Sequence, residues 1–312
     1  MTLVGAFACS HAALMVTRRD ACDAALQQQV YAAFTQVGER IAALEADVVV
    51  VFGTDHGRNF TLEHVPAFTI GIGAVAHGMG DGGLPQIDFP VDQPLAAEML
   101  TGALAADVDL AFSEDMKIDH SFVTPLMLAF GAPPPTVVPV TQNCAIPPRP
   151  TLARSFSVGR TLGRIAAASS RRVAVIGTGG LSHWVGSQER RDFMNRPPGT
   201  RIAELSQYPV TIADTGSINQ DFDRELLSLG EQGRWEEVLR WSPESIESSA
   251  GNGAQEIRNW IAAAGFADGA PLKSFVYTPV PEWLTGTAVA EFDLSGQEHP
   301  GAAAQPEAAG AR

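Results

Sequence analysis

The chain has 312 residues, enough for one large domain or two small ones, and its 35 acidic residues outnumber its 21 basic residues to give a net charge of −14. This acidity, without a lysine and arginine cluster that could neutralise phosphates, argues against nucleic acid or an anionic membrane as partner and favours a small molecule. No apolar run reaches the roughly 18 residues of a spanning helix, and no basic stretch precedes the apolar N-terminus, so we expect a cytoplasmic protein. Three cysteines without CxxC spacing are expected to be free thiols: Cys9, Cys22 and Cys144.

The first fifty residues predict a strand, a helix and a second strand. Leu3–Ala8 is rich in residues with β preference, and Ala24–Leu44 carries apolar residues at helical spacing. Val48–Phe52 consists of four valines and a phenylalanine, which predicts a strand buried on both faces of a sheet. Together with the strands that follow, this unit predicts an α/β fold with a central, mostly buried mixed sheet flanked by helices.

A histidine follows each of these two strands. His11 lies just past the first strand, and His56 ends the sequence Gly-Thr-Asp-His after the second. Open α/β sheets place ligands and catalytic groups at the carboxyl ends of their strands, where an imidazole can bind a metal or transfer a proton. The adjacent Asp55 could orient the ring of His56. The alternative is a histidine in an ordinary polar turn.

The next stretch contains shorter predicted elements. Pro66–Gly73 is predicted to be a strand, and the glycine-rich Ala74–Gln86 a mobile loop. His77 in this loop and His64 before the strand are not expected to be site residues. A short helix and a short strand follow at Leu95–Leu104 and Asp109–Phe112.

Met116–Phe130 contains a second Asp-His pair, Asp119 and His120, before a helix that Pro125 either starts or interrupts. An aspartate beside a histidine that faces a cleft can fix the imidazole tautomer and raise its basicity. The pair therefore predicts a further acid–base or ligand position.

A fourth histidine follows another predicted strand. Thr136–Val140 is a predicted strand, a helix runs to about Ala168, and Val173–Ile176 is a strand that leads into Gly177–His183, GTGGLSH. The glycines there permit positive φ angles and close backbone approach. The loop matches neither a phosphate-binding GxxxxGK[ST] or GxGxxG motif nor a GxSxG elbow, so nucleotide binding and serine hydrolysis are not expected.

The C-terminal part is more helical. Glu256, one turn before Trp260 in the predicted helix Gly253–Ala264, is either a solvated side chain, which the residues alone favour, or an inward-pointing ligand. Residues 297–312, rich in Ala, Gly, Pro and Glu, predict a disordered tail after one catalytic domain of residues 1–296. The other predicted helices are Asp221–Leu229 and Trp235–Trp241, and the predicted strands or extended connections are Phe275–Pro279 and Ala288–Phe292.

The residues by themselves indicate a metal centre with acid–base groups. Two imidazoles and one carboxylate on one face of a metal are the ligands of non-haem Fe(II) oxygenases, and they leave positions for substrate and O₂. Zinc could use the same ligands and activate water, so a metallohydrolase is the competing interpretation. The four histidines involved are His11, His56, His120 and His183, with one later carboxylate still to be chosen.

Five motifs in combination resemble the class III extradiol ring-cleavage dioxygenases, the superfamily of the protocatechuate 4,5-dioxygenase β-subunit. They are SHAALM at Ser10–Met15, TDH at Thr54–His56, IDHSFVTPL at Ile118–Leu126, GTGGLSH at Gly177–His183 and QEIRNW at Gln255–Trp260. Their order, together with PVPEW at Pro279–Trp283, is most similar to the branch that cleaves 2,3-dihydroxyphenylpropionate. The similarity covers nearly the whole chain apart from the tail.

The resemblance implies a role for each of five residues. His11, His56 and Glu256 match the family's Fe(II) ligands, which reverses the interpretation of Glu256 as a solvated residue. His120 matches the proton donor and His183 the proton acceptor. The resemblance also implies O₂ as co-substrate and a homo-oligomer.

The same resemblance implies extradiol cleavage of 2,3-dihydroxyphenylpropionate or a related substituted catechol. A different catechol, a 2-aminophenol or a gallate-type compound is the alternative substrate, and a zinc hydrolase the alternative class. Gly57, Arg58 and Trp184 follow the histidine motifs and are expected to line the substrate pocket. We hypothesise that Arg58 binds the side-chain carboxylate of the substrate, whereas exposure to solvent or pairing with Glu63 is the alternative.

Overall fold

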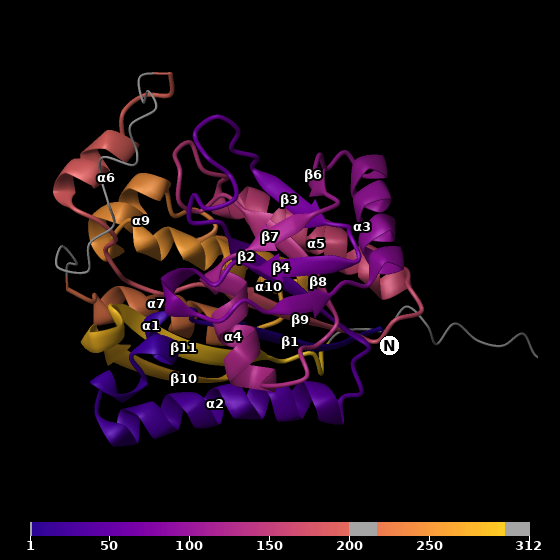
Figure 1. The fold of residues 1–312 in the computed structure, drawn as a ribbon, viewed down its shortest axis with the longest axis horizontal. Coiled ribbons are helices and arrows are strands. Elements are labelled where there is room, and N and C mark those ends of the chain that lie inside the picture. The colour runs from indigo at the N-terminus through magenta and orange to yellow at the C-terminus, as the bar shows by residue number, and fades with distance from the viewer. Residues whose placement is uncertain (1, 200–216, 297–312) are drawn as a thin grey trace, which may run out of the picture.

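The computed structural model describes residues 2–199 and 217–296, and its largest feature is an eight-stranded mixed sheet (Figure 1). Its four central strands are mutually parallel, whereas the strand next to them on each side is antiparallel to them, and on one side that strand forms a hairpin with the edge strand. In spatial order the strands are β10 (Leu272–Val280), β11 (Thr285–Phe292), β1 (Leu3–Cys9), β9 (Val173–Thr178), β2 (Val48–Thr54), β8 (Val137–Gln142), β3 (Phe68–Gly71) and β6 (Ala111–Ser113). The predicted fold class is therefore confirmed.

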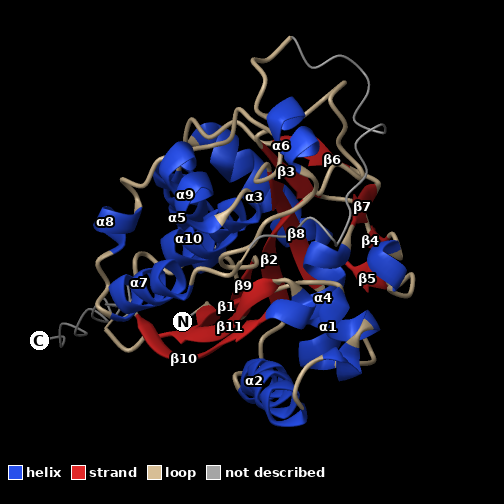
Figure 2. Ribbon diagram, turned by 90° about the vertical axis from the view of Figure 1, so that its left-hand side faces the viewer, coloured by secondary structure: helices blue, strands red, loops and turns tan. Residues whose placement is uncertain are grey.

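Helices cover both faces of this sheet (Figure 2). In β2, Val48 and Val50 belong to the core on one face, and Val49 and Val51 to the core on the other, because successive side chains of a strand point to opposite faces. All four valines are buried, which explains why the strand has no alternation of apolar and polar residues. One face carries α3 (Gln93–Ala105), α5 (Leu152–Ala168), α7 (Gln220–Glu231) and α10 (Ile257–Phe266), and the other α2 (Ala24–Ala43) and α4 (His120–Phe130).

The prediction that Ala74–Gln86 is a loop was wrong. It contains β4 (Val75–Gly78) and a short 3₁₀ turn, η2 (Asp81–Gly83), and His77 lies in the strand. In a separate three-stranded sheet, β4 pairs with β5 (Asp88–Pro90) and with β7 (Met116–Ile118). Strands of three or four residues are too short to show the periodicity from which a strand is normally predicted, and here glycines flank β4 on both sides.

Other predictions were confirmed with shifted boundaries. The expected strand at Asp109–Phe112 is β6, displaced toward the C-terminus, and the late extended segments form the hairpin β10 and β11. Pro125 neither starts nor interrupts α4, which begins at His120 and continues through the proline. The other α-helices of the described residues are α1 (Leu14–Thr17), α6 (Gln188–Met194), α8 (Trp235–Val238) and α9 (Pro243–Ala250), the last of which has no counterpart among the predicted elements.

Close packing of α10 on α5 brings the segment before α10 to the ends of the parallel strands. A Cβ atom at Gly159 of α5 would lie 2.0 Å from the carbonyl oxygen of Ala262, so only glycine permits this approach. Asn259 of α10 donates from Nδ2 to the carbonyl oxygen of Thr178 at the end of β9 (2.6 Å). Among the described residues, no helix is both long and apolar enough to cross a membrane. The predicted tail, residues 297–312, lies outside the described residues, and the single catalytic domain stays a prediction.

Candidate metal centre

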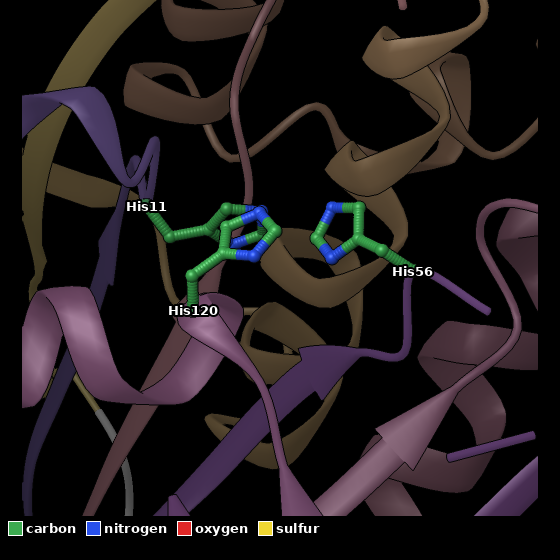
Figure 3. A group of neighbouring side chains, drawn as sticks. All are labelled: His11, His56 and His120. Atoms are coloured by element: carbon green, nitrogen blue, oxygen red, sulfur yellow. The ribbon is translucent and has the colours of Figure 1, made fainter. Parts of the chain in front are cut away.

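The structure brings together all five residues singled out by the sequence. His11 and His56 each lie two residues past the end of a parallel strand, β1 and β2. His183 lies in the loop after β9, His120 is the first residue of α4, and Glu256 ends the 3₁₀ turn η5 (Gly253–Glu256). The side chains of His11, His56 and His120 meet from three separate segments (Figure 3). One potential ligand nitrogen from each of these three histidines lies within 4.8 Å of the others.

The carboxylate of Glu256 lies between two of the imidazoles. Its Oε1 is 2.9 Å from Nε2 of His56, and its Oε2 is 3.0 Å from Nε2 of His11. Oε2 also accepts a hydrogen bond from the backbone N–H of Gly180 (2.8 Å) and lies 3.8 Å from Nε2 of His183. Glu256 is buried, so the interpretation as a solvated side chain was wrong.

The charges in this cluster complement one another. Burial alone would raise the pKa of Glu256, but the neighbouring imidazoles of His11 and His183 hold that pKa well below its usual range. Burial favours neutral His56, but Asp119 and then Glu256 outweigh it and raise the pKa of His56 well above its ordinary value. For His11, burial prevails and lowers the pKa. A buried carboxylate and a neutral imidazole can both donate electron pairs to a divalent cation, and the charge of the cation would offset the cost of burying the carboxylate.

Thr178 at the end of β9 orients the ring of His11. Pro125 has no N–H to bond the carbonyl oxygen of Ser121 one turn earlier, and the hydroxyl of Thr178 donates to that oxygen instead (2.8 Å). The hydroxyl oxygen is then left to accept from Nδ1 of His11 (3.1 Å). His11 therefore directs Nε2 at the cluster, where this buried nitrogen has no hydrogen bond of acceptable geometry despite its closeness to Glu256.

Asp119 orients His56, and the expectation that Asp55 does so was wrong. One oxygen of Asp119, Oδ2, accepts from both Nδ1 and the backbone N–H of His56, each at 2.9 Å. Asp55 instead accepts from three backbone N–H groups of the turn that follows, those of Arg58, Asn59 and Phe60. Asp55 therefore shapes the loop, and Asp119 orients the ring.

Asp81 holds His120, a partnership that sequence reasoning missed. Its Oδ2 accepts from Nδ1 of His120 (2.6 Å), and its Oδ1 accepts from the backbone N–H of the same residue (2.8 Å). Asp119, the sequence neighbour of His120, turns to His56 instead. The only available signal was an aspartate among glycines, which is common in turns.

His183 is held by a backbone carbonyl. Its Nδ1 lies 2.8 Å from the carbonyl oxygen of Leu181, an acceptor, so Nδ1 carries a proton and the lone pair of the neutral ring is on Nε2. The preceding Ser182 donates to the buried carboxylate of Asp223 from its backbone N–H (2.7 Å) and its hydroxyl (2.8 Å). Asp223 also accepts from the hydroxyl of Tyr277 (2.9 Å), which fixes the loop against α7 and β10.

The glycines of the GTGGLSH loop serve close packing. Gly177, Gly179 and Gly180 are not among the residues with positive φ, so that part of the prediction was wrong. The prediction that the backbone approaches another segment closely was correct, because a Cβ atom at Gly179 would lie 2.5 Å from the carbonyl oxygen of Glu256. The loop therefore packs closely against the segment that carries the Glu256 carboxylate.

Two other expected pocket residues lie near the histidine motifs. The guanidinium Nε of Arg58 is 3.9 Å from Oδ2 of Asp81, and 53% of its side chain is exposed. Among the ion pairs of the described residues, Arg58 pairs with Asp81 and not with Glu63. The Arg191 guanidinium stacks over the Trp184 ring at 5.1 Å.

Comparison with known proteins identifies the family. Residues 5–288 match the family described as the catalytic LigB subunit of aromatic ring-opening dioxygenase. The chain belongs to this family. Membership of the LigB family implies a metal cofactor, and the imidazole cluster with its buried carboxylate provides the donor atoms for one.

Three curated relatives of this LigB-family chain share one name, 2,3-dihydroxyphenylpropionate/2,3-dihydroxicinnamic acid 1,2-dioxygenase. The protein from Paraburkholderia phymatum is 32% identical over 270 residues, covering 80% of this chain and 84% of its own. One from Escherichia coli is 31% identical over 276 residues, covering 80% and 86%. One from Rhodococcus jostii is 30% identical over 303 residues, covering 90% and 95%.

Proposed function

We propose that this protein is an Fe(II)-dependent extradiol dioxygenase that opens a catechol ring with O₂. The observation that carries the proposal is the position of the Glu256 carboxylate, 2.9 Å and 3.0 Å from the Nε2 atoms of His56 and His11. Each of these rings has its Nδ1 engaged elsewhere, so both Nε2 atoms face the carboxylate and can bind a metal, which displaces the proton from Nε2 of His56. Two imidazoles and one carboxylate are the ligand set of non-haem iron oxygenases.

In this proposal His11, His56 and Glu256 hold the iron. When bound, Fe(II) supplies a Lewis acid on which a catechol and O₂ can meet in one coordination sphere. His120 also lies in the imidazole cluster, but its Nδ1 donates to Asp81. We assign it to proton transfer because Glu256 contacts both other imidazoles, which completes a set of three without it.

The partners of the two remaining histidines support different proton-transfer roles. His183 donates from Nδ1 to a backbone carbonyl, so Nε2 is the nitrogen at which the neutral ring can accept a proton. His120 is tied through Nδ1 to the carboxylate of Asp81, so the proton that it can exchange with a substrate is the one on Nε2. We propose that His183 accepts a catechol hydroxyl proton at Nε2 and that His120 donates a proton from Nε2 as the ring opens.

The proposed substrate is 2,3-dihydroxyphenylpropionate or a related catechol with an acidic side chain, as the names of the relatives suggest. Arg58 follows the His56 motif, and Arg190 of α6 follows the His183 loop. Burial and then the charge of Arg58 lower the pKa of Arg190. Two such cations are suited to bind a carboxylate.

The chemistry can be tested by anaerobic reconstitution with Fe(II), followed by O₂ and a panel of catechols. We expect oxygen uptake and a coloured ring-fission product, with the highest kcat/KM on catechols that carry a carboxylate side chain. A 2-aminophenol and a gallate-type compound in the panel test the alternative substrates. Hydrolysis without oxygen uptake would instead identify a zinc hydrolase, the class that the family match disfavours. The cytoplasmic location and the homo-oligomer stay predictions.

A further inference from the structure

Asp81 is a carboxylate to which the proposed function gives no role of its own. Its side chain is 9% exposed, and both of its oxygens bind the same residue: Oδ2 accepts from the ring Nδ1 of His120, and Oδ1 from the backbone N–H. The second contact also satisfies the first N–H of helix α4, where a negative charge is favourable. One carboxylate thus fixes both the backbone and the ring orientation of His120.

The small sheet brings the two residues together. β4 and β7 are parallel neighbours that end at the same level, with Gly78 opposite Ile118, and the N–H of Met79 extends the pairing to the carbonyl oxygen of Ile118 (2.9 Å). Asp81 lies three residues past the end of β4, and His120 lies two residues past the end of β7. The carboxyl ends of parallel strands meet at one edge, so this pairing places Asp81 beside His120.

We propose that Asp81 is the positioning residue of His120, an inference that rests on the proposed function of His120 as proton donor. Because Nδ1–H is engaged by Asp81, the proton that leaves the imidazolium comes from Nε2, the nitrogen turned away from the carboxylate. The ring that remains is neutral and still donates from Nδ1 to Asp81. Nε2 then takes up the proton for the next cycle, so Asp81 itself gains and loses none.

The Asp81→Asn variant tests whether Asp81 positions the His120 ring or only accepts a hydrogen bond from the first N–H of helix α4. Asparagine keeps one accepting oxygen, but its NH₂ group accepts nothing, so the two contacts that Asp81 makes through separate oxygens cannot both keep their geometry. We expect kcat to fall by at least about 10-fold, toward the roughly 10⁴-fold loss seen when the orienting aspartate of a catalytic histidine is replaced by asparagine. Iron content and the KM for catechol should stay near parent values.

The matched control is Asp88→Asn, an exposed carboxylate of the same small sheet that pairs with His77. Its kcat should equal that of the parent. Because Asp81 acts through His120, the double variant Asp81→Asn/His120→Gln should be no slower than His120→Gln alone. An additional loss in the double variant, loss of iron in Asp81→Asn, or an unchanged kcat would overturn the inference.

A measurement on the metal-free protein tests, without any turnover, whether Asp81 holds the Nδ1–H of His120. In ¹⁵N NMR spectra of the imidazoles, assigned with His120→Gln, the parent should show His120 protonated at Nδ1, and Asp81→Asn should lose that preference. A parent protein in which neutral His120 carries its proton on Nε2 would refute the role of Asp81. This result does not depend on ring cleavage, so a protein that consumes no O₂ would defeat the proposed function and leave the positioning test intact.

Discussion

Replacing Thr178 by valine should weaken metal binding although the residue touches no metal. Valine has nearly the shape of threonine but no hydroxyl, so Nδ1 of His11 and the carbonyl oxygen of Ser121 both lose their partner. Pro125 cannot supply the missing N–H to that carbonyl. Each unsatisfied buried group costs about 1–3 kcal/mol, so the free energy of unfolding should fall by about 2–6 kcal/mol.

Apart from this loss of stability, Thr178→Val should also lower the metal affinity, because the ring of His11 is no longer held with Nε2 toward the site. Loss of such a supporting hydrogen bond typically costs about 10- to 100-fold in affinity. Urea unfolding of the metal-free protein measures the first effect, and anaerobic Fe(II) titration against a chelator measures the second.

Thr54→Val is the matched control for this experiment. Thr54 is also buried at the end of a parallel strand, and its hydroxyl donates to the carbonyl oxygen of Gln142 (3.0 Å), but it accepts no hydrogen bond from a histidine ring. This variant should lose stability but keep the parent's metal affinity. Equal metal affinities in Thr178→Val and Thr54→Val would refute the orienting role of Thr178.

Three further predictions concern activity and thiol chemistry. His120→Ala and His183→Ala should each keep iron while turnover falls by about 10²- to 10⁴-fold, as for a lost general acid or base, and near-normal turnover in both would reduce them to structural residues. Arg58→Ala should lower kcat/KM on 2,3-dihydroxyphenylpropionate more than on unsubstituted catechol, whereas equal losses would indicate an effect through Asp81. Iodoacetamide should label only Cys22 in the native protein, because Cys9 and Cys144 are buried and burial raises the pKa of both of these thiols. Mass spectrometry that finds Cys9 or Cys144 modified before Cys22 would contradict this prediction.

The convergence of three of the histidines was predictable because it follows from strong, local signals. Val48–Phe52 is apolar without interruption, as a strand buried on both faces must be. His11, His56 and His183 follow three strands that lie side by side and run parallel, so their carboxyl ends meet at one edge. Glu256 could not be chosen from periodicity alone, because its burial depends on the loop after β9 packing against it.

The partners of the histidine rings were not predictable. In extended backbone, adjacent side chains point to opposite sides, so the aspartate before a histidine is poorly placed to reach its ring. Asp119, whose backbone is extended, accordingly contacts the distant His56 and not its neighbour His120. Asp81 reaches His120 only because β4 pairs with β7, and these strands are too short to have a recognisable pattern.

Iron stoichiometry measured together with oxygen uptake tests most directly whether His11, His56 and Glu256 hold a catalytic iron. After anaerobic reconstitution, the parent should retain about one equivalent of Fe(II) per chain and consume O₂ with 2,3-dihydroxyphenylpropionate. His56→Ala should lose the iron and the oxygen uptake together while its circular dichroism spectrum stays that of the parent. Stoichiometric iron in His56→Ala would contradict the assignment of this metal centre.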